Sequence, residues 1–216
     1  MIGSLRARIA REEFDYQVLL DALGDYARPR DKISDLLQKG VIVRIKKGLY
    51  VFGPGHGRRP YSRELLANLI YGPSYISLES ALHHYGLIPE RVEAVISVAT
   101  GRSRRFNTPA GLFLYRQIPL EAYRVGMTRA EVAGEPAFFI ATPEKALSDK
   151  IRLDRGTGLR TIRQVYAYLV ENLRIDESAL AALDPEAIAE IGSRYRSGKV
   201  QHLAGLVRRM SKGWRL

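Results

Sequence analysis

The sequence has no cysteine among its 216 residues. Disulfide bonds, zinc sites with thiolate ligands and thiol catalysis are therefore excluded, and the composition favours a reducing compartment. The chain also lacks any apolar run that approaches the roughly 18 residues of a membrane-spanning helix. The opening stretch MIGSLRARIAREEF contains arginines but no apolar segment, so no secretory signal is expected. These absences predict a cytoplasmic protein without a membrane partner.

Histidine is scarce as well, with four residues in the chain. Glu79 and His83 are four positions apart on an expected helix, but a metal site needs three or four converging ligands. No further ligand is evident, so neither a metal nor a cofactor is expected. The apolar residues of ESALHHYGL are then predicted to be core residues: Ala81, Leu82 and Leu87.

Acidic residues are not arranged for metal-dependent hydrolysis. A nuclease of the restriction type places an acidic residue two positions before a lysine, so that both face a metal-bound water. No lysine of this chain has Asp or Glu at that position. The stretch TPEKALSDKI instead predicts a capped helix, with Thr142 as N-cap and Pro143 at the first helical position. We assign no catalytic residue and expect that the protein is not an enzyme.

Positive charge, in contrast, is abundant. The 34 Lys and Arg exceed the 23 Asp and Glu, which gives a net charge of +11 and a pI near 10.0. Residues 28–63 carry ten Lys or Arg against two Asp, and residues 102–116 carry four Arg and no acidic residue. Charge concentrated in a short segment indicates a docking face for a polyanion, with nucleic acid favoured over an anionic membrane surface.

The most basic segment has the pattern of a DNA-binding unit. A helix is predicted from Arg11 to about Leu23, and a second helix starts at Pro29 and ends before Gly40. Two short strands with a basic turn follow in VIVRIKKGLYVF. Helix, helix and hairpin is the order of a winged helix-turn-helix, whose second helix enters the major groove.

The basic and polar residues of this unit are assigned to DNA. Those on or beside the second helix are Arg28, Arg30, Lys32, Ser34, Gln38 and Lys39. Those of the hairpin, which would contact phosphates, are Arg44, Lys46 and Lys47. Asp31 and Asp35 count against the assignment, because they would repel phosphates unless they face bases or internal partners. The alternative is a solvated helix and hairpin in a generic basic domain.

We predict an α+β protein of two domains. Residues 1–53 form the winged-helix DNA-binding domain and residues 54–60, within GPGHGRRP, form a linker dense in Gly and Pro. Residues 61–216 form the second domain, a mixed α/β domain to about 152 with a helical C-terminal end. The helices expected in that end cover 161–173, 178–183, 186–195 and 199–211.

Further arginines are candidates for contact with nucleic acid or another anion. Arg58 and Arg59 lie in the predicted linker, where the alternative is a soluble hinge. VEAVISVAT and GLFLYRQI are expected to pair as a hairpin joined by GRSRRFNTPA. The joining loop holds Arg102, Arg104 and Arg105, for which the alternative is a solvated loop.

Four stretches together resemble the AbiEi antitoxins of type IV toxin–antitoxin systems. They are RPRDKISDLLQKGVIVRIKKGLYV, YISLESALHHYGLIPE, SVATGRSRRFNTPAGLFLYRQI and ATPEKALSDKI. They occur in the family's order and cover roughly residues 15 to 152, whereas 153–216 contains no motif that matches. The resemblance implies an N-terminal winged helix that binds inverted repeats in its own promoter and represses the operon.

The resemblance also implies a C-terminal domain that counteracts a nucleotidyltransferase toxin encoded beside it. In such systems a stable complex between the two is usually not assumed, so direct binding is left open, as is the oligomeric state. The expected function is that of an antitoxin and transcriptional autorepressor with double-stranded operator DNA as partner. Alternatives are a one-component regulator whose C-terminal domain senses a ligand, a nucleic-acid-processing enzyme and an RNA-binding module.

Overall fold

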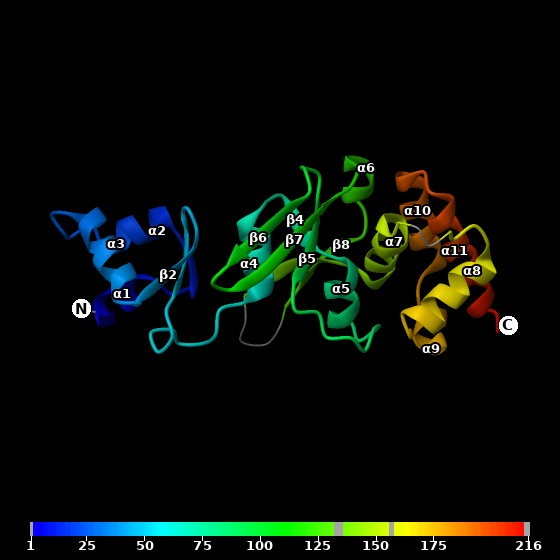
Figure 1. The fold of residues 1–216 in the computed structure, drawn as a ribbon, viewed down its shortest axis with the longest axis horizontal. Coiled ribbons are helices and arrows are strands. Elements are labelled where there is room, and N and C mark those ends of the chain that lie inside the picture. Colours follow the sequence, from blue (N-terminus) through cyan, green and yellow to red (C-terminus); the bar gives the residue numbers. More distant parts are fainter. Residues whose placement is uncertain (1, 132–135, 156–157, 214–216) are drawn as a thin grey trace.

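The computed structural model of the protein describes residues 2–131, 136–155 and 158–213. It is a mixed α and β fold, and Figure 1 shows its parts in a row. Helices with a small sheet lie at one end, a larger sheet with helices lies in the middle, and a group of helices lies at the other end. No helix in these three ranges is long and apolar enough to cross a membrane.

The N-terminal part has three helices and a three-stranded antiparallel sheet. In chain order its elements are α1 (Ile2–Arg8), β1 (Glu13–Asp15), α2 (Tyr16–Ala22), α3 (Pro29–Gln38), β2 (Ile42–Lys46) and β3 (Leu49–Phe52). The strands are arranged in the order β1-β3-β2. The second predicted helix and the hairpin are confirmed at these positions. The N-terminal helix α1 was not predicted.

The first predicted helix was placed too early. Residues 13–15 form an edge strand, in which Phe14 lies opposite Tyr50 of β3. The helix begins only at Tyr16, where the carboxylate of Asp15 accepts a hydrogen bond of 2.9 Å from the backbone N–H of Val18. Pairing with a distant strand therefore overrides the helical spacing of the apolar residues in this stretch.

Helix α3 ends as its sequence predicts. After the C-cap Lys39, Gly40 adopts a positive φ of +66°, which glycine tolerates without a steric penalty. The N–H of Gly40 donates to the carbonyl of Leu37, and the N–H of Val41 donates to the carbonyl of Leu36. This pair of bonds is a Schellman motif, which satisfies the last carbonyls of the helix and aims the chain into β2.

The β2–β3 hairpin has apolar residues buried on both of its faces. One set packs in the N-terminal core: Ile42, Tyr50 and Phe52. The other set belongs to the larger core that extends through the rest of the chain: Ile45, Leu49 and Val51. A register shift between Arg44 and Lys46 interrupts the regular alternation of β2. The hairpin thus packs the N-terminal part against the middle part.

The middle part contains a six-stranded sheet. Its elements are α4 (Arg63–Ile70), β4 (Ser74–Ile76), α5 (Leu78–His84), β5 (Val95–Ala99), β6 (Arg104–Thr108), β7 (Gly111–Gln117), α6 (Leu120–Tyr123), β8 (Met127–Ala130) and β9 (Phe138–Ala141). The strand order is β6-β7-β5-β4-β9-β8, and the β5–β7 and β4–β9 pairs are parallel. The hydroxyl of Tyr115 donates to the carbonyl of Ala67 at 2.6 Å, which fixes α4 on one face of the sheet.

The hairpin predicted between VEAVISVAT and GLFLYRQI is wrong. Those two runs form β5 and β7, and they pair in parallel, with Val98 opposite Arg116. The antiparallel partner of β7 is β6, which lies inside the segment taken for a loop. A tight turn at residues 109–110 joins β6 to β7, so the crossover places β7 between β6 and β5.

The helical end confirms the four predicted helical segments. Its elements are α7 (Pro143–Leu153), α8 (Ile162–Ala167), a π-helix η1 (Tyr168–Asn172), α9 (Glu177–Ala181), α10 (Pro185–Tyr195) and α11 (Gly198–Met210). Thr142 caps α7 as predicted, because its hydroxyl accepts a hydrogen bond of 3.3 Å from the backbone N–H of Lys145. Buried apolar residues of α7, α10 and α11 join the larger core.

The segment predicted as a linker has neither helix nor strand, but it is fixed at several points. The N–H of Gly53 donates to the carbonyl of Val41 at 2.9 Å. A Cβ at Gly53 would lie 1.9 Å from the carbonyl oxygen of Gly40, so this close approach requires glycine. At the far end, the N–H of Ser62 donates to the buried carboxylate of Glu13 at 2.5 Å. The strand β1 is thereby attached to the residue that caps α4.

Candidate nucleic-acid interface

Helix α3 presents one polar face to solvent. Arg30, Ser34 and Gln38 are exposed and follow each other at intervals of four residues, so they lie along one side of the helix. Ile33 and Leu36 are buried on the opposite side. The hydroxyl of Ser34 donates to the carbonyl of Arg30 at 3.2 Å. The side chains of Arg30 and Gln38 have no partner within the described part of the chain.

The acidic residues of α3 have internal cationic partners. The ammonium groups of Lys32 and Lys39 each lie 2.7 Å from a carboxylate oxygen of Asp35. Hydrogen bonds from Lys32 and then from Lys39 hold the pKa of Asp35 below its usual value. Arg28 lies 4.0 Å from Asp31. These contacts reduce the repulsion expected from the two acids, and they also occupy two lysines that we assigned to DNA.

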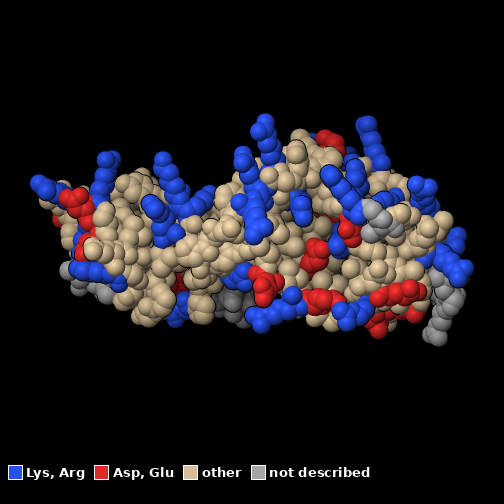
Figure 2. Space-filling view, in the orientation of Figure 1, with Lys and Arg blue, Asp and Glu red and all other residues tan. Residues whose placement is uncertain are grey.

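The basic residues of the hairpin differ in what they contact. Arg44 and Lys47 are exposed, and neither has a side-chain partner among the described residues. Lys46 instead donates a hydrogen bond to the carbonyl of Ile70 at the end of α4, and burial lowers its pKa. Lys46 therefore joins the hairpin to the middle part, in contrast to its assigned phosphate contact. Figure 2 shows Lys and Arg side chains along the upper edge of the N-terminal part.

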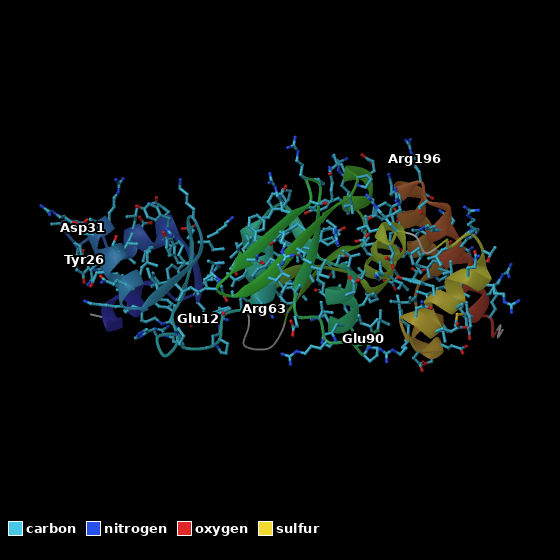
Figure 3. The ribbon with its side chains drawn as sticks, viewed as in Figure 1. Glu12, Tyr26, Asp31, Arg63, Glu90 and Arg196 are labelled. Atoms are coloured by element: carbon cyan, nitrogen blue, oxygen red, sulfur yellow. The ribbon has the colours of Figure 1, made fainter. Side chains whose placement is uncertain are left out.

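Arg58 and Arg59 both have partners within the protein, although Arg58 is exposed and Arg59 is only partly buried. A guanidinium nitrogen of Arg58 donates to the carbonyl of Arg6 at 3.0 Å, and its backbone N–H donates to Glu12 at 3.0 Å. Arg59 lies 3.3 Å from the fully buried carboxylate of Glu13. The two arginines assigned to an anion thus hold the segment that leads to α4, and Figure 3 shows Glu12 beside that segment.

Arg102, Arg104 and Arg105 are exposed, and their side chains have no partner within the described ranges. Only Arg102 lies in a connecting loop, because Arg104 and Arg105 begin strand β6. Successive residues of a strand point to opposite faces of the sheet. Arg104 and Arg105 therefore start toward opposite faces of the sheet, in contrast to the single loop expected to hold all three arginines.

Sequence reasoning missed a buried polar network between α7, α10 and the residue before α5. The ammonium of Lys145 and the carboxylate of Asp149 form an ion pair, and both side chains have no exposed surface. Asp149 also accepts hydrogen bonds from the hydroxyl groups of Tyr195 at 2.5 Å and Ser77 at 2.6 Å. Burial lowers the pKa of Lys145, although Asp149 opposes the shift. Burial and the charge of Asp149 raise the pKa of Tyr195.

Two residues of α7, Asp149 and Lys150, contact the backbone neighbours of a residue with a strained conformation. Leu78, the first residue of α5, is buried and has a φ of +53°, a conformation that bulky side chains rarely adopt. The residue before it, Ser77, is bonded to Asp149, and the residue after it, Glu79, lies 2.8 Å from the ammonium of Lys150. Two consecutive residues of α7 therefore fix the backbone on both sides of Leu78.

The stretch around the paired histidines packs as predicted. The core contains all three of its predicted residues: Ala81, Leu82 and Leu87. His83 and His84 are exposed, and Glu79 is paired with Lys150 and not with a histidine. Within the described residues, no group of three or more His, Asp or Glu is placed to hold a metal ion.

Two cavities border the middle part. One, of about 590 Å³, lies between the hairpin and the segment that leads to α4. Its walls are mainly apolar and include Val43, Ile45 and Tyr61, with Arg58 and Arg59 among the polar residues. The other, of about 780 Å³, lies next to the start of α5 and the end of α7 and has more polar walls.

No family model matches the sequence, and no curated protein matches it either.

Proposed function

We propose that the protein is a sequence-specific DNA-binding autorepressor and antitoxin whose N-terminal part acts as a winged helix-turn-helix. The observation that carries the DNA-binding proposal is the contrast among its cations. Arg30, Arg44 and Lys47 are exposed on α3 and the hairpin without partners in the described residues, whereas the side chains of Lys46, Arg58 and Arg59 each contact a partner within the protein. Exposed cations that have no internal partner can neutralise phosphates without breaking an existing contact.

The two elements have different roles in this proposal. Helix α3 enters the major groove, where Arg30, Ser34 and Gln38 face base edges along one side of the helix. The hairpin places Arg44 and Lys47 against the phosphate backbone, which fixes the register on the duplex. Lys32 and Lys39 remain near the groove but are bound to Asp35, so they add positive charge without direct readout.

A gel-shift experiment tests the DNA-binding proposal. The DNA is the region upstream of the gene, and a random duplex of equal length is the control. We expect the upstream region to bind at least ~10³-fold more tightly than the random duplex at near-physiological salt. Raising the salt weakens both complexes, but the preference persists because base contacts depend on salt less than phosphate contacts do. Equal affinity for both duplexes at both salt concentrations would refute the proposal.

The antitoxin activity is proposed on the resemblance of four sequence stretches, and the partner is a nucleotidyltransferase encoded beside this chain. In this proposal the protein is cytoplasmic and has no enzymatic activity of its own. Co-expression tests it: the chain should restore growth to cells that express the neighbouring nucleotidyltransferase. The full-length double variant Arg30→Ala/Lys47→Ala serves as the comparison, because it removes two residues assigned to DNA and keeps the hairpin residues that pack in the larger core. Growth arrest in the presence of the full chain would contradict the antitoxin activity.

A second candidate function is that of a one-component regulator that responds to a small molecule. The apolar cavity of about 590 Å³ favours it, because ligand sites are typically concave, mostly apolar and supplied with a few polar groups. The cavity lies between the hairpin and the segment that leads to α4, so a ligand there could change the orientation of the DNA-binding part relative to the middle part. Thermal shifts with a metabolite panel, followed by gel shifts with any hit, would separate this function from the antitoxin.

A further inference from the structure

The larger cavity is a cleft over the β5–β7 strand pair. It has a volume of about 780 Å³, which lies in the range of sites for small molecules. Ile96 and Arg116 both line it, and they share one face of the sheet, because Leu114, two residues before Arg116, lies opposite Ile96. The start of α5 and the end of α7 complete the walls.

One wall of the cleft carries two carboxylates held in place by a lysine. The ammonium of Lys150 lies 2.8 Å from Oε1 of Glu79 and 3.2 Å from Oδ2 of Asp154. The hydroxyl of Tyr168 donates to the same Oδ2 of Asp154. Oε2 of Glu79 and Oδ1 of Asp154 have no partner in the described part of the chain. These two oxygens are therefore available as acceptors at fixed positions.

The cleft also contains two arginines, neither of which is paired with an acid of the described residues. Arg116 and Arg155 both line it and are exposed, and their side chains have no partner in the ranges described. Ser103, beside them in the lining, accepts a hydrogen bond of 3.0 Å from the backbone N–H of Gln117, which leaves its own hydroxyl proton free to donate. Two guanidinium groups and a hydroxyl donor form a set that suits a phosphate.

Apolar residues supply the rest of the lining. Ile96, Ile118 and Leu153 offer a surface on which a flat ring can pack. A ligand that uses every part of the cleft needs an anionic group, a flat body of low polarity and donors that reach the carboxylates. A nucleoside phosphate has all three features.

We propose that this cleft binds a free nucleoside phosphate. Its phosphate lies at Arg116 and Arg155, its base packs on Ile96, and its amino or hydroxyl groups donate to the open oxygen of Glu79. The site is independent of operator binding, because none of the α3 or hairpin residues assigned to DNA lines it. Loss of nucleotide binding would leave the DNA-binding proposal untouched, and the reverse also holds.

Calorimetric titration of the full-length protein tests the site. The probes are the four nucleoside monophosphates, with adenosine, inorganic phosphate and a single-stranded RNA of six nucleotides for comparison. The variants are Arg116→Ala, Arg155→Ala and Glu79→Gln. The matched control is Arg163→Ala, because Arg163 is also an exposed arginine but does not line the cleft.

We expect at least one monophosphate to bind more tightly than both adenosine and inorganic phosphate. Arg116→Ala and Arg155→Ala should each weaken it at least about tenfold, because hydrogen bonds to a charged group are lost. Arg163→Ala should leave the affinity within about twofold. Absence of binding by all four monophosphates overturns the proposal, as does an affinity that neither arginine change alters. Inorganic phosphate that binds as tightly as the nucleotide overturns the nucleoside part, and tighter binding of the RNA overturns a free nucleotide as the ligand.

Discussion

The C-terminal end of helix α3, with its cap Lys39, and helix α7 each have a lysine and an aspartate four residues apart, but the two pairs differ in burial. In α3, Asp35 and Lys39 lie at the surface, with 33% and 60% of their side chains exposed. In α7, Lys145 and Asp149 have no exposed side-chain surface. The charges of the first pair remain hydrated in the folded protein, whereas those of the second pair are removed from water when the protein folds.

The difference shows how one chain uses charge in two ways. At the surface of α3, the carboxylate of Asp35 is shared by two lysines, and the polar face as a whole remains open to a partner. Inside the fold, Asp149 must find every partner within the protein, and it accepts from Lys145, Tyr195 and Ser77. Such a network connects α7 to α10 and to the residue before α5, so its members contribute to the packing of these elements.

The largest effect is expected from the buried pair. Asp149→Ala removes the carboxylate paired with Lys145, so the buried ammonium keeps its contacts with Tyr195 but loses its counter-charge. We expect a loss of about 3–5 kcal/mol in the free energy of unfolding, from urea titrations followed by circular dichroism. Asp35→Ala, the matched change at the surface, should move the urea midpoint far less.

A double variant sharpens this test. Lys145→Met combined with Asp149→Leu removes both charges and keeps a similar side-chain volume, so it should recover part of the lost stability, although the hydroxyls of Tyr195 and Ser77 lose their acceptor. The comparison fails if Asp149→Ala and Asp35→Ala shift the midpoint equally. It also fails if the double variant is no more stable than the single one.

Glu13 lies between these extremes, because it is fully buried and its partner Arg59 is 27% exposed. Glu13→Gln weakens the bonds to Arg59 and to the N–H of Ser62, so we expect a loss of roughly 1.5–3 kcal/mol in the free energy of unfolding. Hydrogen exchange at the Ser62 amide should become faster in the variant. Glu93→Gln, at an exposed site, is the control. Unchanged exchange at Ser62 would show that Glu13 does not fix the joint.

The sequence predicts the elements whose signals are local. Pro29 and Gly40 mark the ends of α3, and both signals act through backbone geometry that needs no tertiary partner. Thr142 likewise predicts the start of α7. The strand at Glu13–Asp15 could not be predicted in this way, because it exists only through its pairing with β3. The parallel β5–β7 pair depends on a crossover that periodicity does not report.

In the candidate site, too, positions that depend on local spacing were predictable, and positions that depend on tertiary contacts were not. The exposure of Arg30 and Lys47 follows from helical spacing and from a turn, so both positions were predictable. Lys46 was assigned to phosphate because nothing in VIVRIKKGLYVF shows that a register shift aims it at the carbonyl of Ile70. Lys145 lies four residues from Asp149 on the same helix, but the other two partners, Tyr195 and Ser77, come from distant segments, so spacing along the chain does not reveal the whole network. Helical spacing and turn signals therefore predict which charged residues lie at the surface, whereas tertiary contacts determine which of them have a partner within the protein.

The exposed side of the comparison is tested by operator binding. If Arg30 reads a guanine, Arg30→Ala should cost roughly 1–3 kcal/mol of binding free energy and relax the preference at that base pair. Fluorescence anisotropy with the upstream region and a set of single-base variants measures both effects. Stability in urea should not change, because the side chain of Arg30 has no partner within the described residues. A uniform loss across all DNA sequences would assign Arg30 to phosphate.

Lys46 and Lys47 are adjacent in the sequence, but their substitution should have different effects on DNA binding and on stability. Lys47→Ala should weaken all duplexes alike and reduce the slope of log affinity against log salt by about one, since one phosphate contact is lost. Lys46→Ala should leave that slope unchanged and lower the urea midpoint, because it removes the hydrogen bond to Ile70. Salt titrations of both variants beside the unaltered chain make the measurement. If Lys46→Ala reduced the salt slope and Lys47→Ala did not, the hairpin would pack differently against the middle part when DNA is bound.

The smallest effect concerns the pH dependence of the surface pair. Hydrogen bonds from Lys32 and Lys39 hold the pKa of Asp35 below its usual value of 3.8. A carboxyl group whose pKa is lower in the folded than in the unfolded state stabilises the fold above the unfolded value, and this contribution is lost as the pH falls through the folded value. Asp35→Asn should therefore lower the urea midpoint slightly at neutral pH, and the difference should disappear in the acid range below 3.8. Because Asp35 is solvated, added salt should shrink the difference at neutral pH as well. A difference that grows on acidification would mean that Asp35 is protonated more readily in the folded state, and that its two lysines do not act as partners in solution.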